Sequence, residues 1–295
     1  MAVYKRSYKS FSGEKISPAW RFLVVTRYSF GELLQLRAFL VALVVSAIPF
    51  LVALAFIYIM NSSAARMALN LGNIPLLPID NKFFAKLLAV QDFFAIVLTA
   101  YAAPVIMSPD LTNNALPLFL SRPFSRPEYV LGKSLVLGVV ISAITWIPDL
   151  LLIGIQSTMA GWQWISANWF IAPGIVLGAF LYIAMLCLMS LAVSSWVKWR
   201  VVATGFVFGL FFVPAGFGVA FNAILRTYWG HLLNPSYLMQ VIWNDLLRVP
   251  PLFNLPTRNG IGLPVGAAWA MIVLITFACL LLLNKRLRAK EVVRG

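Results

Sequence analysis

The sequence is poor in charged residues and in the side chains that most enzyme and metal sites use. Only 11% of its 295 residues are charged, against about 25% in soluble domains, whereas 61% are hydrophobic. It has one histidine, His231, and two cysteines, Cys187 and Cys279, both within apolar stretches. One histidine excludes bis-histidine haem ligation within one chain, and the cysteines offer neither a disulfide framework nor a zinc site. We expect an integral membrane protein with no metal and no cofactor.

Familiar catalytic motifs are also missing. The chain has no G-x-S-x-G motif, and Gly132-Lys133-Ser134 resembles only the end of a phosphate-binding loop. Pro127 stands where the first glycine of G-x-x-x-x-G-K-S is needed, and no strand precedes the tripeptide. We therefore expect the chain to bind no nucleotide and to have no enzymatic activity of its own.

The excess of basic residues, a net charge of +14, surrounds the uncharged stretches and forms no polar basic domain. This distribution favours charges that orient a protein in a membrane over a nucleic-acid-binding surface. The basic and polar segment 1–20 lacks the apolar core and small-residue cleavage site of a secretory signal. We therefore expect the mature protein to keep these residues and to have no nucleic-acid partner.

Long uncharged stretches predict an all-α polytopic membrane protein whose single transmembrane domain covers residues 1–295. A helix crosses the hydrocarbon core, about 30 Å thick, with about 20 apolar residues. Residues 150–197 carry no charge and are too many for one helix, but the polar segment 161–168 divides them. The six predicted transmembrane helices are 39–60, 84–106, 134–155, 169–194, 201–224 and 263–283.

Two further segments are predicted to contact the membrane without crossing it. Ser17-Pro18 is a helix-start signal, and apolar residues gather on one side of the helix predicted at 17–36. We expect this helix to lie in the membrane interface, and the alternative is an extended first transmembrane helix. Residues 226–261 are apolar and aromatic but contain four prolines, which predicts an outer re-entrant or interfacial segment.

Lysine and arginine are unevenly divided between the two sides of the predicted membrane domain. Six crossings put both termini on one side, and that side, with segment 108–133, carries 17 of the 23 basic residues. By the positive-inside rule, both termini and segment 108–133 face the cytoplasm. We expect a multi-pass protein of the cell (inner) membrane of a bacterium.

The connection between the second and third predicted spans, 108–133, contains two ordered pieces. Asp110 follows a proline and is a plausible N-cap of a short helix at about 111–120, which Pro117 must bend or divide. Ser125 and Glu128 then have the spacing of a capping box, with Pro127 in the first turn. The sequence therefore predicts a surface helix followed by a rigid restart into the bilayer.

Two acidic residues lie within predicted spans. Asp92 is 16 residues before Ser108, and Asp149 is 16 residues after Lys133, so both are about 24 Å from the cytoplasmic ends of their helices. Intramembrane acids usually face the bundle interior or a wet cavity. With Gln91, they are candidates to line a translocation path. The alternative is structural: caps of outer helix ends in water, or partners for Lys82 or Lys86.

The stretch LPLFLSRPFSRPEYVLGK, residues 116–133, resembles the cytoplasmic loop of ABC transporter type-2 permeases, the membrane subunits of exporters. The similarity is specific over this loop and rests elsewhere on the number of helices and the two flanking segments. The matching residues are Leu118, Leu120, Ser121, Arg122, Pro123, Ser125, Arg126, Glu128, Tyr129, Leu131, Gly132 and Lys133.

The resemblance implies that a separate cytoplasmic ABC ATPase subunit docks on a coupling helix at 109–121, and that two permeases, either copies or paralogues, form the path. Arg122 and Arg126 are expected to pair with partner carboxylates or lipid phosphates, or to be ordinary positive-inside charge. The candidate ATPase-coupling residues are Asp110, Leu111, Asn114, Leu116, Phe119, Arg122 and Arg126.

Two other classes of protein are alternatives. A membrane anchor or assembly subunit of a larger complex would use the same loop for docking but transport nothing. An intramembrane enzyme or redox subunit is disfavoured, because the chain lacks the ligands such a subunit needs. The resemblance leaves the substrate open among lipids, peptides, drugs and polymer chains.

Overall fold

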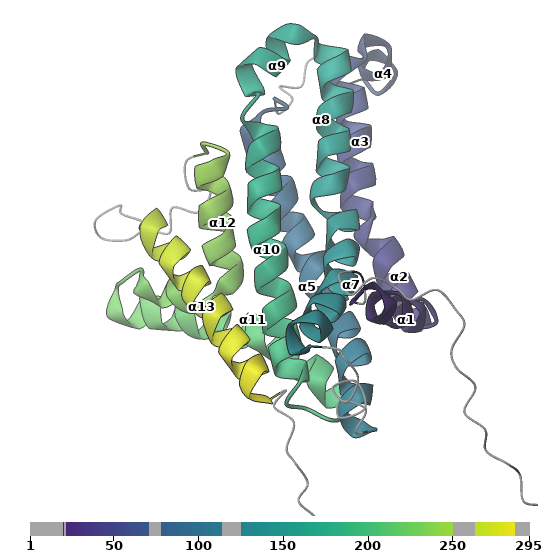
Figure 1. Cartoon of the computed structure of the whole chain (residues 1–295). Helices are drawn as coiled ribbons and strands as arrows, with labels where there is room; N and C mark the ends of the chain where they lie inside the picture. Colours follow the sequence, from purple (N-terminus) through teal and green to yellow (C-terminus); the bar gives the residue numbers. More distant parts are fainter. Residues whose placement is uncertain (1–19, 21, 71–77, 114–124, 250–262, 287–295) are drawn as a thin grey trace, which may run out of the picture.

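A computed structural model describes residues 20, 22–70, 78–113, 125–249 and 263–286, and every regular element within these ranges is a helix (Figure 1). The elements are α1 (Phe22–Leu34), α2 (Arg37–Ser46), α3 (Ile48–Asn61), α4 (Ser63–Ala68), α5 (Asn81–Thr112), α7 (Arg126–Ile144), α8 (Trp146–Ala160), α9 (Trp162–Asn168), α10 (Ile171–Ser194), α11 (Arg200–Leu225), the 3-10 helix η2 (Trp229–Leu233), α12 (Pro235–Leu246) and α13 (Val265–Arg286).

Six helical stretches are long and apolar enough to cross a membrane, which confirms the predicted all-α fold and the predicted number of candidate spans. The third, α7 with α8, is longer than predicted because helix continues from Arg126 to Ala160. Thr145 interrupts it, and Pro148 follows the break, where it has no N–H to donate to a preceding carbonyl. The six stretches are Arg37–Asn61, Asn81–Asp110, Arg126–Ala160, Ile171–Ser194, Arg200–Leu225 and Val265–Arg286.

The helices α5 and α10 form the buried centre of the bundle. They pack on each other, and α5 also contacts α2, α7 and α11. Figure 1 shows α3, α5, α8 and α10 running side by side, while α13 slants toward the foot of α10. We call the end at which α5 ends and α7 begins the foot of the bundle. A displacement of α5 at the foot therefore acts on several transmembrane helices at once.

The helix α1 is separate from the first transmembrane helix. Leu36 has an extended backbone conformation and precedes α2 as its N-cap, so the chain changes direction there. Figure 1 shows α1 nearly end-on at the foot, across the direction of the long helices. The alternative of one extended first transmembrane helix is therefore wrong.

The proline-rich segment 226–261 forms two short helices in its described part, η2 and α12, whereas residues 250–261 lie outside the description. Asn234 caps α12, since its side chain accepts a hydrogen bond from the Tyr237 amide. Trp243 of α12 is only 2% exposed and packs on Tyr182 of α10, with ring centroids 5.0 Å apart. Gly178 provides the space for this contact, because a Cβ there would lie 2.6 Å from the Trp243 indole.

The close approach at Gly178 gives a direct test of the packing between α10 and α12. We expect Gly178→Ala to lower the free energy of unfolding by about 1–3 kcal/mol, the usual cost of overpacking a core. Gly154→Ala is the matched control, because Gly154 also lies within a transmembrane helix but has no neighbour within 4 Å of an added Cβ. Unfolding of the two variants in detergent micelles gives the comparison. Equal stability of both variants would contradict the packing described.

Candidate functional site

Asp110 lies within α5 and is not the N-cap of a new helix, so that expectation is wrong. Helix α5 continues to Thr112. Asn113 is its C-cap, and the backbone N–H of Asn113 donates to the Pro109 carbonyl at 2.9 Å. The physical reason is tertiary: the Asp110 carboxylate has a cation and a hydroxyl as partners, which a local capping argument does not include. Asp110 Oδ2 lies 2.8 Å from Lys133 Nζ and accepts a hydrogen bond from the Tyr129 hydroxyl at 2.7 Å.

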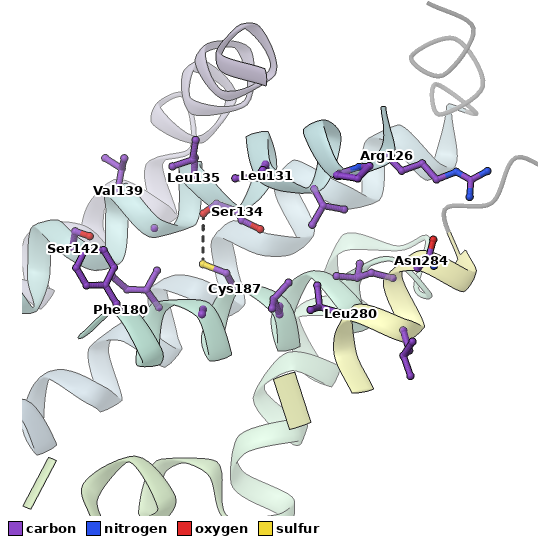
Figure 2. A pocket seen from close by; sticks show the side chains of 18 of the residues that line it. Arg126, Leu131, Ser134, Leu135, Val139, Ser142, Phe180, Cys187, Leu280 and Asn284 are labelled. Carbon is purple, nitrogen blue, oxygen red and sulfur yellow. Dashed lines mark hydrogen bonds between the residues drawn. The ribbon is translucent and has the colours of Figure 1, made fainter. Parts of the chain in front are cut away.

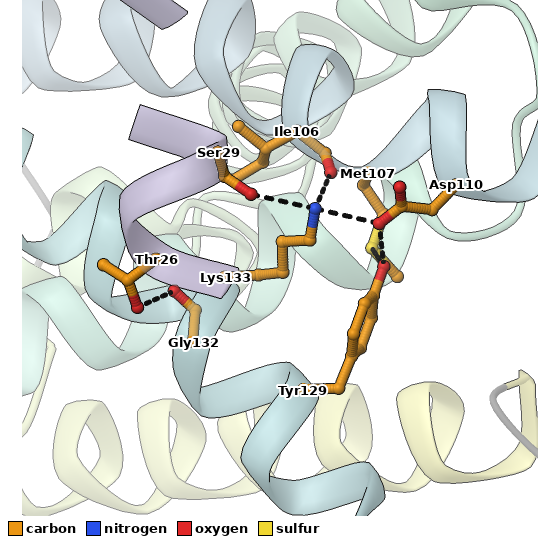
Figure 3. A network of polar contacts seen from close by, with 8 residues as sticks. All are labelled: Thr26, Ser29, Ile106, Met107, Asp110, Tyr129, Gly132 and Lys133. Carbon is orange, nitrogen blue, oxygen red and sulfur yellow. Dashed lines mark hydrogen bonds and ion pairs between the residues drawn. The ribbon is translucent and has the colours of Figure 1, made fainter. Parts of the chain in front are cut away.

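Lys133 is the centre of a polar cluster at the foot, which we define as Ser29, Asp110, Tyr129 and Lys133 (Figure 3). Its ammonium donates to Ser29 Oγ at 3.0 Å and to the Ile106 carbonyl at 2.6 Å, besides pairing with Asp110. These three acceptors match the three protons of an ammonium group. The foot cluster therefore satisfies the charge completely and joins α1, α5 and α7.

Burial makes this arrangement demanding. The Lys133 side chain is only 3% exposed and that of Asp110 is 15% exposed. Transfer of a charge out of water costs several kcal/mol, which only good geometry and full hydrogen bonding offset. If α1, α5 or α7 moved independently, the ammonium would lose a partner in a place that water does not reach. The foot cluster therefore fixes the positions of α1, α5 and α7 relative to one another.

Gly132 brings α1 into direct contact with α7 beside the foot cluster. Thr26 Oγ1 donates to the Gly132 carbonyl at 3.0 Å, as Figure 3 shows, and a Cβ at Gly132 would lie 2.9 Å from the Phe22 carbonyl oxygen. The Gly-Lys pair that resembles part of a phosphate-binding loop therefore serves helix packing here. Glycine permits the close approach, and the next residue supplies the buried charge.

The predicted capping box at the start of α7 is confirmed. The Glu128 amide donates to Ser125 Oγ at 3.4 Å, and the Ser125 amide donates to Glu128 Oε2 at 2.6 Å. Pro127 lies in the first turn, where it has no helical partner to lose. A defined helix start therefore follows the connection that leaves α5, and the foot cluster holds both helices.

The remaining residues of the predicted coupling helix are only partly described. Arg126 opens α7 and is half-buried. Leu111 lies in the last turn of α5. All of segment 114–124 lies outside the described residues, and with it Asn114, Leu116, Phe119 and Arg122.

A second polar cluster, which we call the mid-bundle cluster, consists of Gln91, Asp92, Asp149 and Tyr182 and lies between α5, α8 and α10. Gln91 Nε2 donates to Asp149 Oδ1 at 2.8 Å, and the Tyr182 hydroxyl donates to Asp92 Oδ1 at 2.6 Å. Both acids are buried, with Asp149 fully so and Asp92 5% exposed. They neither cap helix ends in water nor pair with Lys82 or Lys86, so the structural alternative in that form is wrong.

The mid-bundle cluster leaves two acceptors unused. Asp149 Oδ2 and Gln91 Oε1 are buried and have no hydrogen-bond partner among the described residues. Buried polar atoms are nearly always paired in folded proteins, so an unpaired couple in a bundle interior marks a place of functional interest. The sequence identified all three residues as candidates, but it did not identify Tyr182 as the partner of Asp92.

The other singled-out side chains have ordinary packing roles. Cys187 is buried, Cys279 is half-buried, and both are free thiols. His231 stacks on Tyr237 with ring centroids 4.2 Å apart, and burial lowers the pKa of this histidine. Within the described ranges, no group of three or more His, Cys, Asp or Glu side chains is placed to hold a metal ion.

Comparison with known proteins assigns no family. No protein-family model matches the chain, and no curated protein sequence matches it. The functional interpretation therefore depends on the loop sequence, the foot cluster and the mid-bundle cluster.

A double-mutant cycle tests the ion pair of the foot cluster. We expect Lys133→Met to lower the free energy of unfolding by about 3 kcal/mol, because the Asp110 carboxylate would lose its cation in a partly buried site. Asp110→Asn strands the ammonium in the same way, so the double variant should lose about 1–3 kcal/mol less than the sum of the single losses.

Unfolding in detergent micelles measures the cycle, and Lys82→Met is the matched control. Lys82 is exposed at the opposite end of α5, so its loss should change stability by about 0.5 kcal/mol or less. Additive losses at Lys133 and Asp110 would show that the pair does not couple α5 to α7.

The mid-bundle cluster gives a second stability test. We expect Tyr182→Phe to cost about 1–3 kcal/mol, because the buried Asp92 carboxyl would lose its closest hydrogen-bond donor. Tyr58→Phe is the control, since Tyr58 is 57% exposed. Thermal unfolding of both variants gives the comparison, and a Tyr182→Phe variant as stable as the control would argue against a structural hydrogen bond there.

Proposed function

We propose that this chain is the permease subunit of an ATP-driven ABC exporter and that a separate cytoplasmic ATPase acts on it through the connection between α5 and α7. The foot cluster is the observation that carries the proposal. The connection leaves a helix at Thr112 and enters another at Arg126, and a buried ion pair holds these two helices together with α1. A partner that moves the connection therefore moves a three-helix unit.

The central position of α5 supports the transmission of such movement. It has 32 residues, about 48 Å of helix, and contacts α2, α10 and α11 as well as its partners in the foot cluster. Rigid elements joined by satisfied polar contacts transmit displacement, whereas a slack loop absorbs it. The proposed mechanism is rigid-body displacement of α5 and α7 when the ATPase closes. The docking segment is the predicted coupling helix at 109–121, and the residues in it or next to it are Asp110, Leu111, Asn114, Leu116, Phe119, Arg122 and Arg126.

The uneven distribution of basic residues supports a cytoplasmic foot. The foot carries Arg126, Lys133, Lys198 and Arg200, and the end of α13 adds Lys285 and Arg286. Under the positive-inside rule, this end faces the cytoplasm of a bacterium, with both termini there and the protein in the inner membrane. In that orientation α1 lies in the interface next to the docked ATPase.

A second permease, either a copy or a paralogue, fits the outer face of α11. This helix exposes Phe206, Phe212, Val213 and Phe217. Gly205 and Gly209 are four residues apart, and an added Cβ at either would have no neighbour within 4 Å. Small residues at this spacing allow two membrane helices to approach closely, which supports α11 as the pairing surface.

The mid-bundle cluster is the candidate polar element of the translocation path. Asp149 and Gln91 each offer an unpaired acceptor, and Asp92 is held by Tyr182 at the same level of α5. Paired spans that shift at the foot would change the distance between α5 and α8, and with it the contact between Gln91 and Asp149. The same foot cluster would also suit a non-transporting membrane anchor, and the experiment below distinguishes the two functions.

Purification of the full-length protein from its native membrane tests the proposal. We expect an ABC ATPase to co-purify and its vanadate-sensitive ATP hydrolysis to fall severalfold in a Leu116→Ala/Phe119→Ala variant, because the docking segment loses its apolar contacts. Leu274→Ala/Phe277→Ala is the matched control, since both residues are 60% exposed on α13, away from the connection. Assembly into a stable complex without an ATPase would contradict the exporter and favour the anchor.

A further inference from the structure

A long groove of about 940 Å³ runs between α7, α10 and α13, on a side of the bundle to which α11 contributes nothing (Figure 2). Its volume is at the upper end of the range for ligand sites, about 300–1,000 Å³. On α7 it extends from Arg126 to at least Ser142, which corresponds to about 24 Å of helix. That length exceeds half of a hydrocarbon core about 30 Å thick, so the groove is long enough for one acyl chain of a leaflet.

The walls of the groove are apolar and open sideways. Leu131 and Val139 of α7, Phe180 of α10 and Leu281 of α13 all line it, and each is between 51% and 65% exposed. In a chain whose α7, α10 and α13 cross a membrane, side chains exposed along this length face hydrocarbon. The groove therefore presents a concave apolar surface to the lipid phase.

One end of the groove is polar and basic. Figure 2 shows Arg126 and Asn284 at the same end of the groove, with Ser142 and Phe180 at the other. Lys285 follows Asn284 and is exposed in the last turn of α13. Glu128, an acid in the first turn of α7, is held by the capping box through the Ser125 amide. The foot end therefore offers a guanidinium and an amide to the apolar channel.

We propose that this groove is a binding site for a phospholipid with an anionic headgroup, drawn from the leaflet at the foot. Its acyl chain lies along α7 and α10, and its headgroup phosphate pairs with Arg126. Charge complementarity selects this occupant, because guanidinium groups bind phosphate oxygens with charge-assisted hydrogen bonds and basic pockets between membrane helices bind acidic headgroups. A second protein copy fits the open, small-residue face of α11 better than a concave channel with a cationic end.

The site also has a structural consequence beyond the proposed exporter role. A bound lipid would bridge the start of α7, next to the foot cluster, and the end of α13. These two helices do not follow each other in the chain, and the groove lies between them. Occupancy of the groove would therefore add a lateral connection to the same end of the bundle.

Photolabelling of the full-length protein tests the lipid site without any ATPase. The protein is reconstituted in phosphatidylcholine vesicles that contain a photoactivatable phosphatidylglycerol, and labelled peptides are identified by mass spectrometry. We expect labels on groove residues of α7, α10 and α13, and about fivefold better competition by unlabelled phosphatidylglycerol than by phosphatidylcholine, as one basic residue near an anionic surface predicts.

Matched variants separate the headgroup contact from the acyl-chain channel. Arg126→Gln should abolish the fivefold preference, and Arg126→Lys should keep it in part. Ala184→Phe fills the channel and should reduce groove labelling severalfold, whereas Ala278→Phe, at an exposed position outside the groove, should not.

Equal competition by phosphatidylglycerol and phosphatidylcholine in the wild-type protein would overturn the proposal. It would show that the groove binds any acyl chain and does not recognise the headgroup. So would crosslinks from the groove to a second copy of the chain or to segment 287–295, since protein would then be the occupant.

Discussion

The burial of the Lys133 ammonium constrains the end of the bundle more strongly than any apolar contact there. A lysine that is almost inaccessible to water must find an acceptor for each proton, and the chain supplies them from α1 and α5. Apolar helices can slide against one another or against lipid with modest change in energy. A charged group with three fixed acceptors cannot follow such sliding, so it sets the register of the three helices.

Because of this constraint, the connection between α5 and α7 joins two helix ends that cannot move independently. A capping box at Ser125 starts α7 abruptly, and the ion pair to Asp110 ties that start to the last turns of α5. Glycine at position 132 lets α1 approach closely enough for Ser29 and Thr26 to join the contact. The capping box, the glycine and the lysine of this short motif therefore hold α1, α5 and α7 together as one rigid unit.

Two lateral surfaces of the bundle and its interior differ in chemistry. The groove between α7, α10 and α13 is concave and ends in a cation, whereas the face of α11 is aromatic with two open glycines. Between them, the interior holds acids whose partners are an amide and a phenol instead of cations. Such neutral partners suit a site in a low-dielectric interior, where a full ion pair would need further hydrogen bonds to offset its desolvation.

The sequence by itself determined the features that depend on neighbours in the chain. Long apolar runs, interrupted only by Lys86, Asp92 and Asp149, predicted the six spans, and the Ser125-to-Glu128 spacing predicted the start of α7, because hydropathy and capping are local properties. The charged residues of both polar clusters, Asp110, Lys133, Asp92 and Asp149, were also visible, since an acid or lysine within or beside an apolar run is conspicuous.

Only the tertiary structure decided which of these residues meet. Asp110 read alone is an N-cap, but its partners are Tyr129, 19 positions away, and Lys133 on the next helix. Ser29 and Lys133 are 104 positions apart, and Gln91 and Asp149 are 58 apart. Contacts over such separations follow from how helices pack and rotate, and hydropathy, which is similar all around these spans, does not specify the rotation. The groove exists for the same reason, because its three walls come from helices that no local pattern brings together.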